Sequence, residues 1–205
     1  MKSGVEVTAQ EVSWSNWAGN QRVEQASRYS PKTEDELQQI VRQASTNRLR
    51  VKAVGSGHSF TAIALAEEIL VDLSHYDQVI EIDKTKNTVT VQSGIQLSKL
   101  NIELHRNNLA MQNLGDIAYQ TIAGAISTST HGTGLKFSGI ANQVVAMRIV
   151  LADSSVVDCS PEINAELFHC ARVGLGALGL ISTVTLQLIS AFNLSVIEEP
   201  MRVDD

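Results

Sequence analysis

Residues 51–60 read VKAVGSGHSF, and we expect the rest of the chain to fold around this stretch. The β-branched run Val51–Val54 predicts a strand, which leads directly into a loop that contains two glycines. Glycine lets such a loop turn tightly and lets its backbone approach a ligand closely. Successive N–H groups in the loop form a concavity for an anion, to which the hydroxyls of Ser56 and Ser59 add donors. One histidine, His58, stands in the middle of the loop.

The composition is that of an ordinary globular protein, with 205 residues of which 43% are hydrophobic and 19% charged. This length fits one large domain or two small ones. The net charge of −6 and the aromatic content of 4% argue against nucleic acid as a partner, because phosphates favour a basic surface and bases favour aromatic rings. The N-terminus lacks the apolar stretch of a secretory signal, so we expect a cytoplasmic protein, with association with a membrane left open.

Two features have more than one interpretation. Cys159 and Cys170, the latter next to His169, lack the spacing of a zinc site, so we expect both cysteines to pack in the core and predict no metal site. Residues 173–197 contain no charged side chain and are long enough to span a membrane. Their first part is rich in glycine and the part that follows alternates, which favours a buried glycine turn that leads into a strand.

Periodicity and turn residues predict an α+β protein. Thr33 and Glu36 form a capping box, and apolar residues at helical spacing predict a helix over 34–46. This helix connects a strand that ends near Tyr29 to the strand 51–54, and a crossover of this kind makes the two strands parallel. Trp14 and Trp17 are expected to anchor an irregular N-terminal segment by burial. The remaining expected elements are strands at 69–73 and 182–189, hairpins at 78–92 and 144–158, and helices at 96–107 and 165–171, with a seam at 107–113.

A second unusual stretch is QTIAGAISTSTHGTG at residues 120–134, where almost every side chain is small or carries a hydroxyl. Such residues let the backbone pack against a large flat ligand and donate hydrogen bonds to it. A flexible Ser/Thr-rich linker is the alternative. The apolar side chains of Ile122, Ala125 and Ile126 recur at helical spacing, which argues against a linker.

Together these stretches resemble the FAD-linked oxidases of the vanillyl-alcohol-oxidase type, and most closely the sugar-1,4-lactone oxidases and alditol oxidases among them. The resemblance covers nearly the whole chain and rests on the order of its motifs, which are residues 14–17, 51–60, 82–94, 121–134 and 174–186. It implies an α+β FAD-binding domain of two subdomains with the cofactor between them. We expect these subdomains at residues 1–107 and 108–190. Residues 191–205 would begin a link to a substrate domain that this chain lacks.

The resemblance also implies roles for particular residues. His58 matches the family histidine that is joined to the 8α-methyl of the flavin, and the loop around it would hold the pyrophosphate. Gly115 matches a position over the flavin C4a atom, where a small residue leaves a path for dioxygen and so favours an oxidase over a dehydrogenase. No cysteine lies near Gly115, so we expect one flavin bond only. His131 is expected to pack against cofactor or backbone rather than act as a base. The expected cofactor-binding residues are Val54, Gly55, Ser56, Gly57, His58, Ser59, Phe60, Gly115, Asp116, Thr121, Gly124, Thr128, Ser129, Thr130, His131 and Ile181.

The implied activity is oxidation of a hydroxyl of a sugar lactone or polyol, with hydride transfer to FAD and reoxidation by dioxygen to give hydrogen peroxide. We expect the other catalytic residues beyond Asp205. One alternative is a non-catalytic flavin-binding module or subunit that needs a second chain for substrate binding. A second alternative is an α+β domain without a cofactor. The sequence alone does not identify the sugar, the catalytic base or the oligomeric state.

Overall fold

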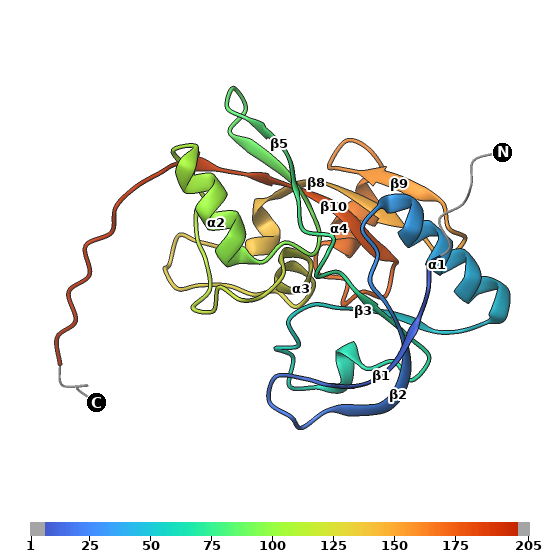
Figure 1. Ribbon diagram of the computed structural model, residues 1–205. Helices are drawn as coiled ribbons and strands as arrows, with labels where there is room; N and C mark the ends of the chain where they lie inside the picture. Colours follow the sequence, from blue (N-terminus) through green and yellow to red (C-terminus); the bar gives the residue numbers. More distant parts are fainter. Residues whose placement is uncertain (1–6, 201–205) are drawn as a thin grey trace.

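The strand Val51–Val54 (β3) lies at the edge of the first of two main sheets in the computed structural model, which describes residues 7–200 (Figure 1). The strands of this sheet lie in the order β1 (Gln10–Ser15), β2 (Arg22–Tyr29), β4 (Ile69–Asp72) and β3. Strand β1 is antiparallel to β2, whereas β2, β4 and β3 run parallel. The parallel orientation expected for the strands on either side of the first helix is confirmed, with β4 inserted between them.

The second sheet is antiparallel throughout. Its strands lie in the order β5 (Val79–Asp83), β6 (Thr88–Gln92), β10 (Leu180–Gln187), β8 (Val144–Val150) and β9 (Val156–Cys159). A separate two-stranded ladder pairs β7 (Leu109–Ala110) with β11 (Ile189–Ser190). Both expected hairpins, β5–β6 and β8–β9, are confirmed, and β10 lies between them.

The two sheets do not divide the chain at the seam expected at residues 107–113. The hairpin β5–β6 belongs to the second sheet, because its partner is β10, about ninety residues later in the chain. The crossing from one sheet to the other therefore falls between β4 and β5, at residues 73–78. Local periodicity identified the hairpin but not the distant strand with which it pairs.

Helix α1 (Glu34–Asn47) joins the two sheets. The Thr33 hydroxyl accepts a hydrogen bond from the Glu36 N–H at 3.2 Å, as the capping box predicts. The Glu36 carboxylate accepts from the N–H of Lys32, one residue before the expected partner. The buried face of α1 packs against both sheets in one apolar cluster, whose members are Tyr29, Leu37, Ile40, Val41, Ala44, Ile69, Val71, Leu73, Tyr76, Val150 and Leu180.

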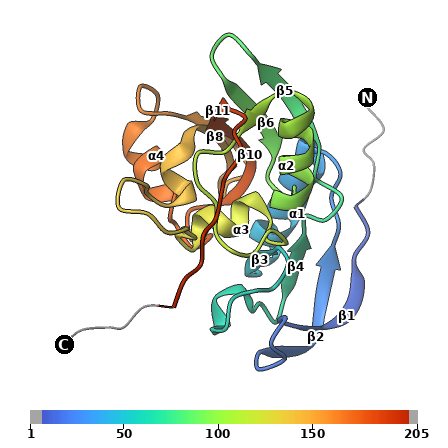
Figure 2. The same ribbon diagram turned by 90° about the vertical axis from the view of Figure 1, so that its left-hand side faces the viewer.

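The other helices pack on the second sheet. They are α2 (Leu97–Arg106), α3 (Ile122–Ser127) and α4 (Ala165–Ala171), which Figure 2 shows grouped around β10. Leu97, Ile122 and Phe168, one from each helix, are all buried in the largest apolar cluster. Two short 3₁₀ helices complete the elements, η1 (Ala62–Ala64) and η2 (Ile140–Gln143). The expected helices are confirmed, including α4 with the bounds that the sequence predicted.

Three expectations about burial are wrong. Trp17 is 68% exposed, and the segment before it forms strand β1, whose pairing with β2 shifts register between Val12 and Trp14. Cys159 is buried as expected, but Cys170 is exposed because it lies on the outer side of α4. The glycine turn before β10 is exposed at Leu175 and Leu178 rather than buried. No helix within residues 7–200 is long and apolar enough to cross a membrane. Two predictions fall partly outside the described residues. Residues 1–6 belong to the N-terminus, on which the prediction of no secretory signal rests, and residues 201–205 belong to the expected link.

A polar network connects α1 to the second sheet. The carboxylate of Glu34 accepts two hydrogen bonds from Arg148 on β8, at 2.9 and 3.0 Å, and one from the Ser182 hydroxyl on β10 at 2.7 Å. The Ser182 hydroxyl also lies 2.8 Å from the phenol oxygen of Tyr76, which is buried. The hydrogen bonds from Arg148, and then from Ser182, hold the pKa of Glu34 below its ordinary value of 4.5, although partial burial acts in the opposite direction.

Glu34→Gln is expected to flatten the dependence of stability on pH. A carboxyl with a lowered pKa in the folded state stabilises the fold at neutral pH, and this contribution is lost as the pH falls below 4.5 toward the folded-state value. The variant should lose roughly 1–2 kcal/mol at neutral pH and correspondingly less in acid. Urea denaturation at several pH values measures the difference. Glu24→Gln, at an exposed position on β2, is the control, and equal curves for the two variants would contradict the prediction.

Candidate functional site

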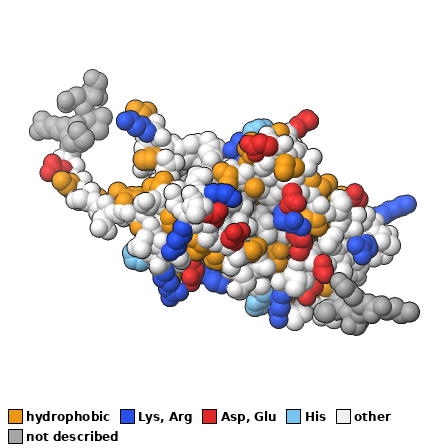
Figure 3. Space-filling view, turned by 90° about the horizontal axis from the view of Figure 1, so that it is seen from above, with side chains coloured by type: hydrophobic (Ala, Val, Ile, Leu, Met, Phe, Trp, Pro, Cys, Tyr) orange, Lys and Arg blue, Asp and Glu red, His pale blue; other side chains and the backbone are white. Residues whose placement is uncertain are grey.

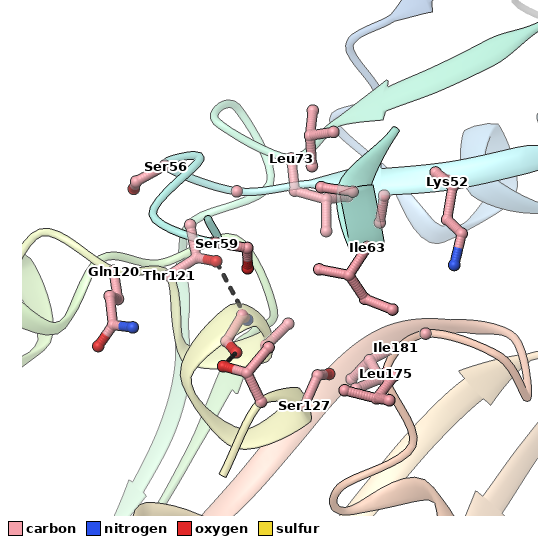
Figure 4. A pocket seen from close by; sticks show the side chains of 18 of the residues that line it. Lys52, Ser56, Ser59, Ile63, Leu73, Gln120, Thr121, Ser127, Leu175 and Ile181 are labelled. Carbon is pink, nitrogen blue, oxygen red and sulfur yellow. Dashed lines mark hydrogen bonds between the residues drawn. The ribbon is translucent and has the colours of Figure 1, made fainter. Parts of the chain in front are cut away.

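A cavity of about 260 Å³ lies between the loop that follows β3 and the second sheet (Figure 4). The loop forms one wall, helix α3 forms the facing wall, and the glycine turn before β10 closes one end. The lining residues are Lys52, Ala53, Val54, Gly55, Ser56, Gly57, His58, Ser59, Ile63, Ala64, Leu73, Gln120, Thr121, Ala123, Gly124, Ser127, Thr128, Leu175, Gly176, Gly179, Leu180 and Ile181.

One glycine of the loop allows the expected tight turn, and the other lets the loop pack closely against α3. Gly57 has a φ of +71°, in the left-handed region that side chains rarely adopt. A Cβ on Gly55 would overlap the Oγ1 atom of Thr121 on the facing wall. The loop therefore approaches α3 as closely as it does because it has no side chain at position 55.

The backbone of the loop presents donors to a ligand. Among the described residues, the N–H groups of Ser56, Gly57, His58 and Ser59 find no acceptor, so they are available to an anion in the cavity. The Ser56 hydroxyl was expected to donate to the anion. In the structure it donates to the backbone carbonyl of Tyr119 instead. Ser56 thus ties the loop to the segment before α3. Ser59 and Thr121 both line the cavity, and both are labelled in Figure 4.

The small residues of 120–134 form the facing wall. Thr121 is the N-cap of α3, and its Oγ1 accepts a hydrogen bond from the Gly124 N–H at 3.2 Å. One turn later the Thr128 hydroxyl donates to the Gly124 carbonyl at 2.9 Å. Ile122 and Ile126 are buried on the other side of the helix, which leaves Ala123, Gly124 and Ser127 to line the cavity. The stretch is therefore a helix that packs against the loop, and the linker alternative is wrong.

The two ends of the cavity differ in character. Figure 4 shows Ile63, Leu175 and Ile181 near one end together with Lys52, and Ser56 and Gln120 at the other end. An apolar end next to a row of free N–H groups suits a ligand with a flat ring attached to an anionic chain.

Sequence reasoning missed several of the lining residues, among them Lys52, Ile63, Gln120 and Leu175. Leu175 adopts a left-handed φ of +53° beside Gly176 at +68°, so the turn directs a leucine toward the cavity. The glycine content of 174–179 was the available signal, but it was interpreted as a buried connection. Lys52 and Gln120 lie within the two stretches that the sequence singled out, but their own residue types give no such signal, and neither does Ile63.

Six of the expected cofactor-binding residues do not line the cavity: Phe60, Gly115, Asp116, Ser129, Thr130 and His131. Gly115 packs against Thr130 and His131. A Cβ on Gly115 would lie 3.0 Å from the Thr130 methyl carbon and 3.3 Å from the His131 carbonyl oxygen. The Thr130 hydroxyl accepts from Gln120 at 3.1 Å, which connects this group to the cavity. Nδ1 of His131 donates to the Gly132 carbonyl at 2.9 Å. This is the backbone contact that was expected of His131.

No cluster of His, Cys, Asp and Glu within residues 7–200 has the arrangement of a metal site. On the face shown in Figure 3, acidic and basic side chains are interspersed, without a field of one sign. The cavity and its free N–H groups are therefore the feature of the described chain that most resembles a ligand site.

Two sheets covered by helices, with a glycine-loop cavity between them, make this an α+β domain with a ligand-sized cavity. The sequence profile described as "FAD binding domain" matches residues 27–160, and the chain belongs to this family. The expected fold class and the resemblance to FAD-linked oxidases are both confirmed.

The most similar curated relatives include two enzymes named for sugar lactones. The chain is 40% identical over 181 residues to an L-gulono-1,4-lactone dehydrogenase of Mycobacterium tuberculosis, and 38% identical over 183 residues to the L-gulonolactone oxidase of Mus musculus. These alignments cover 88% and 89% of the chain but 42% of each relative. The chain therefore spans less than half the length of these relatives.

Solved structures confirm the fold at low sequence identity. A cholesterol oxidase variant from Brevibacterium sterolicum matches with a TM-score of 0.82 and 18% identity, over 92% of this chain and 39% of that one. A chitooligosaccharide oxidase matches with a TM-score of 0.73 and 21% identity, over 80% and 36%. Identity this low supports the shared architecture and nothing more specific.

Proposed function

We propose that this chain is the FAD-binding portion of an oxidase that acts on a hydroxyl of a sugar lactone or polyol and passes the electrons to dioxygen. The observation that carries the proposal is a loop with free N–H groups at Ser56–Ser59 that lines one cavity together with a helix of small residues. The sugar-lactone relatives at 38–40% identity support the substrate class.

The residues present fit FAD. The N–H groups of Ser56–Ser59 would hold the pyrophosphate, and the missing Cβ of Gly55 lets the loop that carries them pack close to α3. Ile63, Leu175 and Ile181 would pack against the adenosine portion. When bound, FAD supplies the acceptance of a hydride from the substrate.

His58 would hold the cofactor covalently, because it lines the cavity and lies within the row of free N–H groups. We further propose that Gly115 leaves a path for dioxygen to the flavin ring. Its Cβ position is already crowded by the Thr130 methyl group, so a larger residue there would have to displace the neighbouring chain. One of the similar relatives is named a dehydrogenase and another an oxidase, so the acceptor requires a direct test.

A second candidate function is a flavin-binding module that needs another chain to bind substrate. The cavity lining favours it, because Lys52 and His58 are the only titratable side chains among the residues that line the cavity. Peroxide formation by the purified chain with a sugar lactone or polyol separates the two candidates. Flavin bound without any turnover would favour the second.

His58→Ala is expected to abolish acid-stable flavin. The purified wild-type chain, supplied with FAD, should be yellow and keep its colour in the pellet after precipitation with acid. In the variant the colour should move to the supernatant, because the imidazole nitrogen that forms the bond is gone. His131→Ala is the matched control and should keep the colour in the pellet. Colour released from the wild-type chain would refute the covalent bond, and a colourless folded wild-type chain would refute FAD binding.

A further inference from the structure

The turn formed by residues 16–21, between β1 and β2, lies against the histidine loop. Asn16 is 4% exposed, and its side-chain amide donates to the Ser59 carbonyl at 2.9 Å. Its Oδ1 atom accepts from the Gln21 N–H at 3.1 Å, which closes the turn. The side chains of Asn20 and Gln21 both donate to the Phe60 carbonyl, at 2.9 and 3.3 Å.

Trp17, also in this turn, contacts the histidine loop at Gly57 and His58. Its backbone N–H donates to the Gly57 carbonyl at 2.8 Å, and its indole ring lies 5.6 Å from the imidazole, with the planes inclined by 34°. Burial does not explain this position, since Trp17 is 68% exposed. The ring nearest to it apart from the imidazole is Phe60, at 6.4 Å in an edge-on arrangement.

These bonds determine where the loop points its donors. In a trans peptide unit the C=O and the following N–H point in opposite directions. The Gly57 carbonyl points toward Trp17, so the His58 N–H points away from the turn. The Ser59 carbonyl is held in the same way by Asn16. The turn therefore fixes the backbone on both sides of His58, while the indole restricts the imidazole itself.

We propose that the turn 16–21 is a positioning element that holds the imidazole of His58 in the orientation needed for its bond to the flavin, with Trp17 and Asn16 as the positioning residues. This inference rests on the proposed function. A histidine in a glycine loop samples several rotamers, and restricting it before reaction lowers the entropic cost of forming the bond.

The bond balances as follows. The imidazole nitrogen of His58 contributes its electron pair to a new N–C bond at the 8α carbon, and that carbon loses one hydrogen as a proton. The imidazole also ends with one proton fewer once it returns to neutrality. The two electrons released from the C–H bond remain on the flavin ring system until dioxygen takes them, together with two protons, as hydrogen peroxide. Trp17 and Asn16 take no part in the electron transfer and act only through His58.

Trp17→Ala tests the proposal. With FAD added to the purified chain, acid-stable flavin should accumulate at least about tenfold more slowly than in the wild type, while the Kd for FAD before bond formation changes by less than about threefold. Trp17→Phe keeps an aromatic face and should restore the rate to within about threefold of the wild type. Asn16→Asp, which removes the amide donor to Ser59, should slow the reaction as well. Phe192→Ala removes an exposed aromatic side chain beyond β11 and serves as the control.

Proton NMR of the imidazole supplies a readout that needs no flavin. The ring current of Trp17 should displace the His58 imidazole resonances in the wild type, and Trp17→Ala should remove this displacement without lowering the thermal midpoint. An unchanged His58 spectrum or an unchanged rate of attachment would overturn the proposal. A parallel loss of melting temperature, FAD affinity and rate would assign Trp17 a merely structural role and overturn it too. Reversible FAD binding without any bond in the wild type would refute this inference alone, whereas a folded chain that binds no FAD would refute the proposed function.

Discussion

Gly94→Ala is expected to leave the chain unfolded. Gly94 follows β6 and is buried against residues 73–78, where the chain crosses from the first sheet to the second. Its N–H donates to the Tyr76 carbonyl at 2.9 Å. A Cβ at this position would overlap the Leu73 carbonyl oxygen and lie 2.7 Å from the Tyr76 carbonyl oxygen. Both obstacles are backbone atoms, so no change of rotamer relieves the overlap.

The loss in free energy of unfolding should lie at the upper end of the range for single substitutions, above about 4 kcal/mol. Gly94 and residues 73–78 must move apart, and the hydrogen bond between them is lost. This is a large part of the about 5–15 kcal/mol that stabilises a typical domain. Soluble yield, far-UV circular dichroism and urea denaturation measure the effect. Gly19→Ala is the control, since a Cβ there has nothing within 4 Å and only its φ of +70° opposes the change. It should cost about 1–2 kcal/mol. A folded Gly94→Ala chain as stable as Gly19→Ala would contradict the prediction.

Local signals predicted most of the fold. The capping box at Thr33, the apolar face of α1 and the alternation in each hairpin act over a few residues, and the structure contains the corresponding elements. The chain crosses between the sheets at residues 73–78, away from the expected seam, because the pairing of β6 with β10 depends on residues far apart in the chain. Gly94 shows the same limit, because the carbonyl that excludes a side chain there belongs to Leu73 on a different segment.

The candidate site was predictable where its residue types are unusual. A glycine loop with a histidine and a run of hydroxyl residues stand out in any sequence, and the structure places them on facing walls. Lys52 and Gln120 have no such signature and reach the cavity only through the packing of β3 and α3. Trp17 was expected in the core because tryptophan is usually largely buried. Its exposed ring beside His58 becomes visible only when β1, β2 and the loop are assembled.

Gly55→Ala is expected to weaken FAD binding by at least about thirtyfold, which corresponds to about 2 kcal/mol. The new methyl group would overlap Oγ1 of Thr121 and lie 3.2 Å from its Cγ2 atom. Thr121 is buried and its Oγ1 caps α3, so rotation of the side chain would sacrifice the hydrogen bond to Gly124. The loop must therefore move away from α3, and its N–H groups lose their position relative to the facing wall. Titration of the purified chain with FAD, followed by fluorescence, measures the change.

A second substitution on the facing wall shows whether this overlap is the cause. Thr121→Ala removes both Oγ1 and Cγ2 and should cost about 1 kcal/mol of stability through the lost cap. In Gly55→Ala/Thr121→Ala the nearest remaining atom is the Cβ at 3.3 Å, so the double variant should bind FAD more tightly than Gly55→Ala alone. Gly55→Ala/Thr121→Ser keeps Oγ1, so its affinity for FAD should stay as low as that of Gly55→Ala. Equal recovery with alanine and with serine would show that the overlap with Oγ1 does not set the distance between the loop and α3.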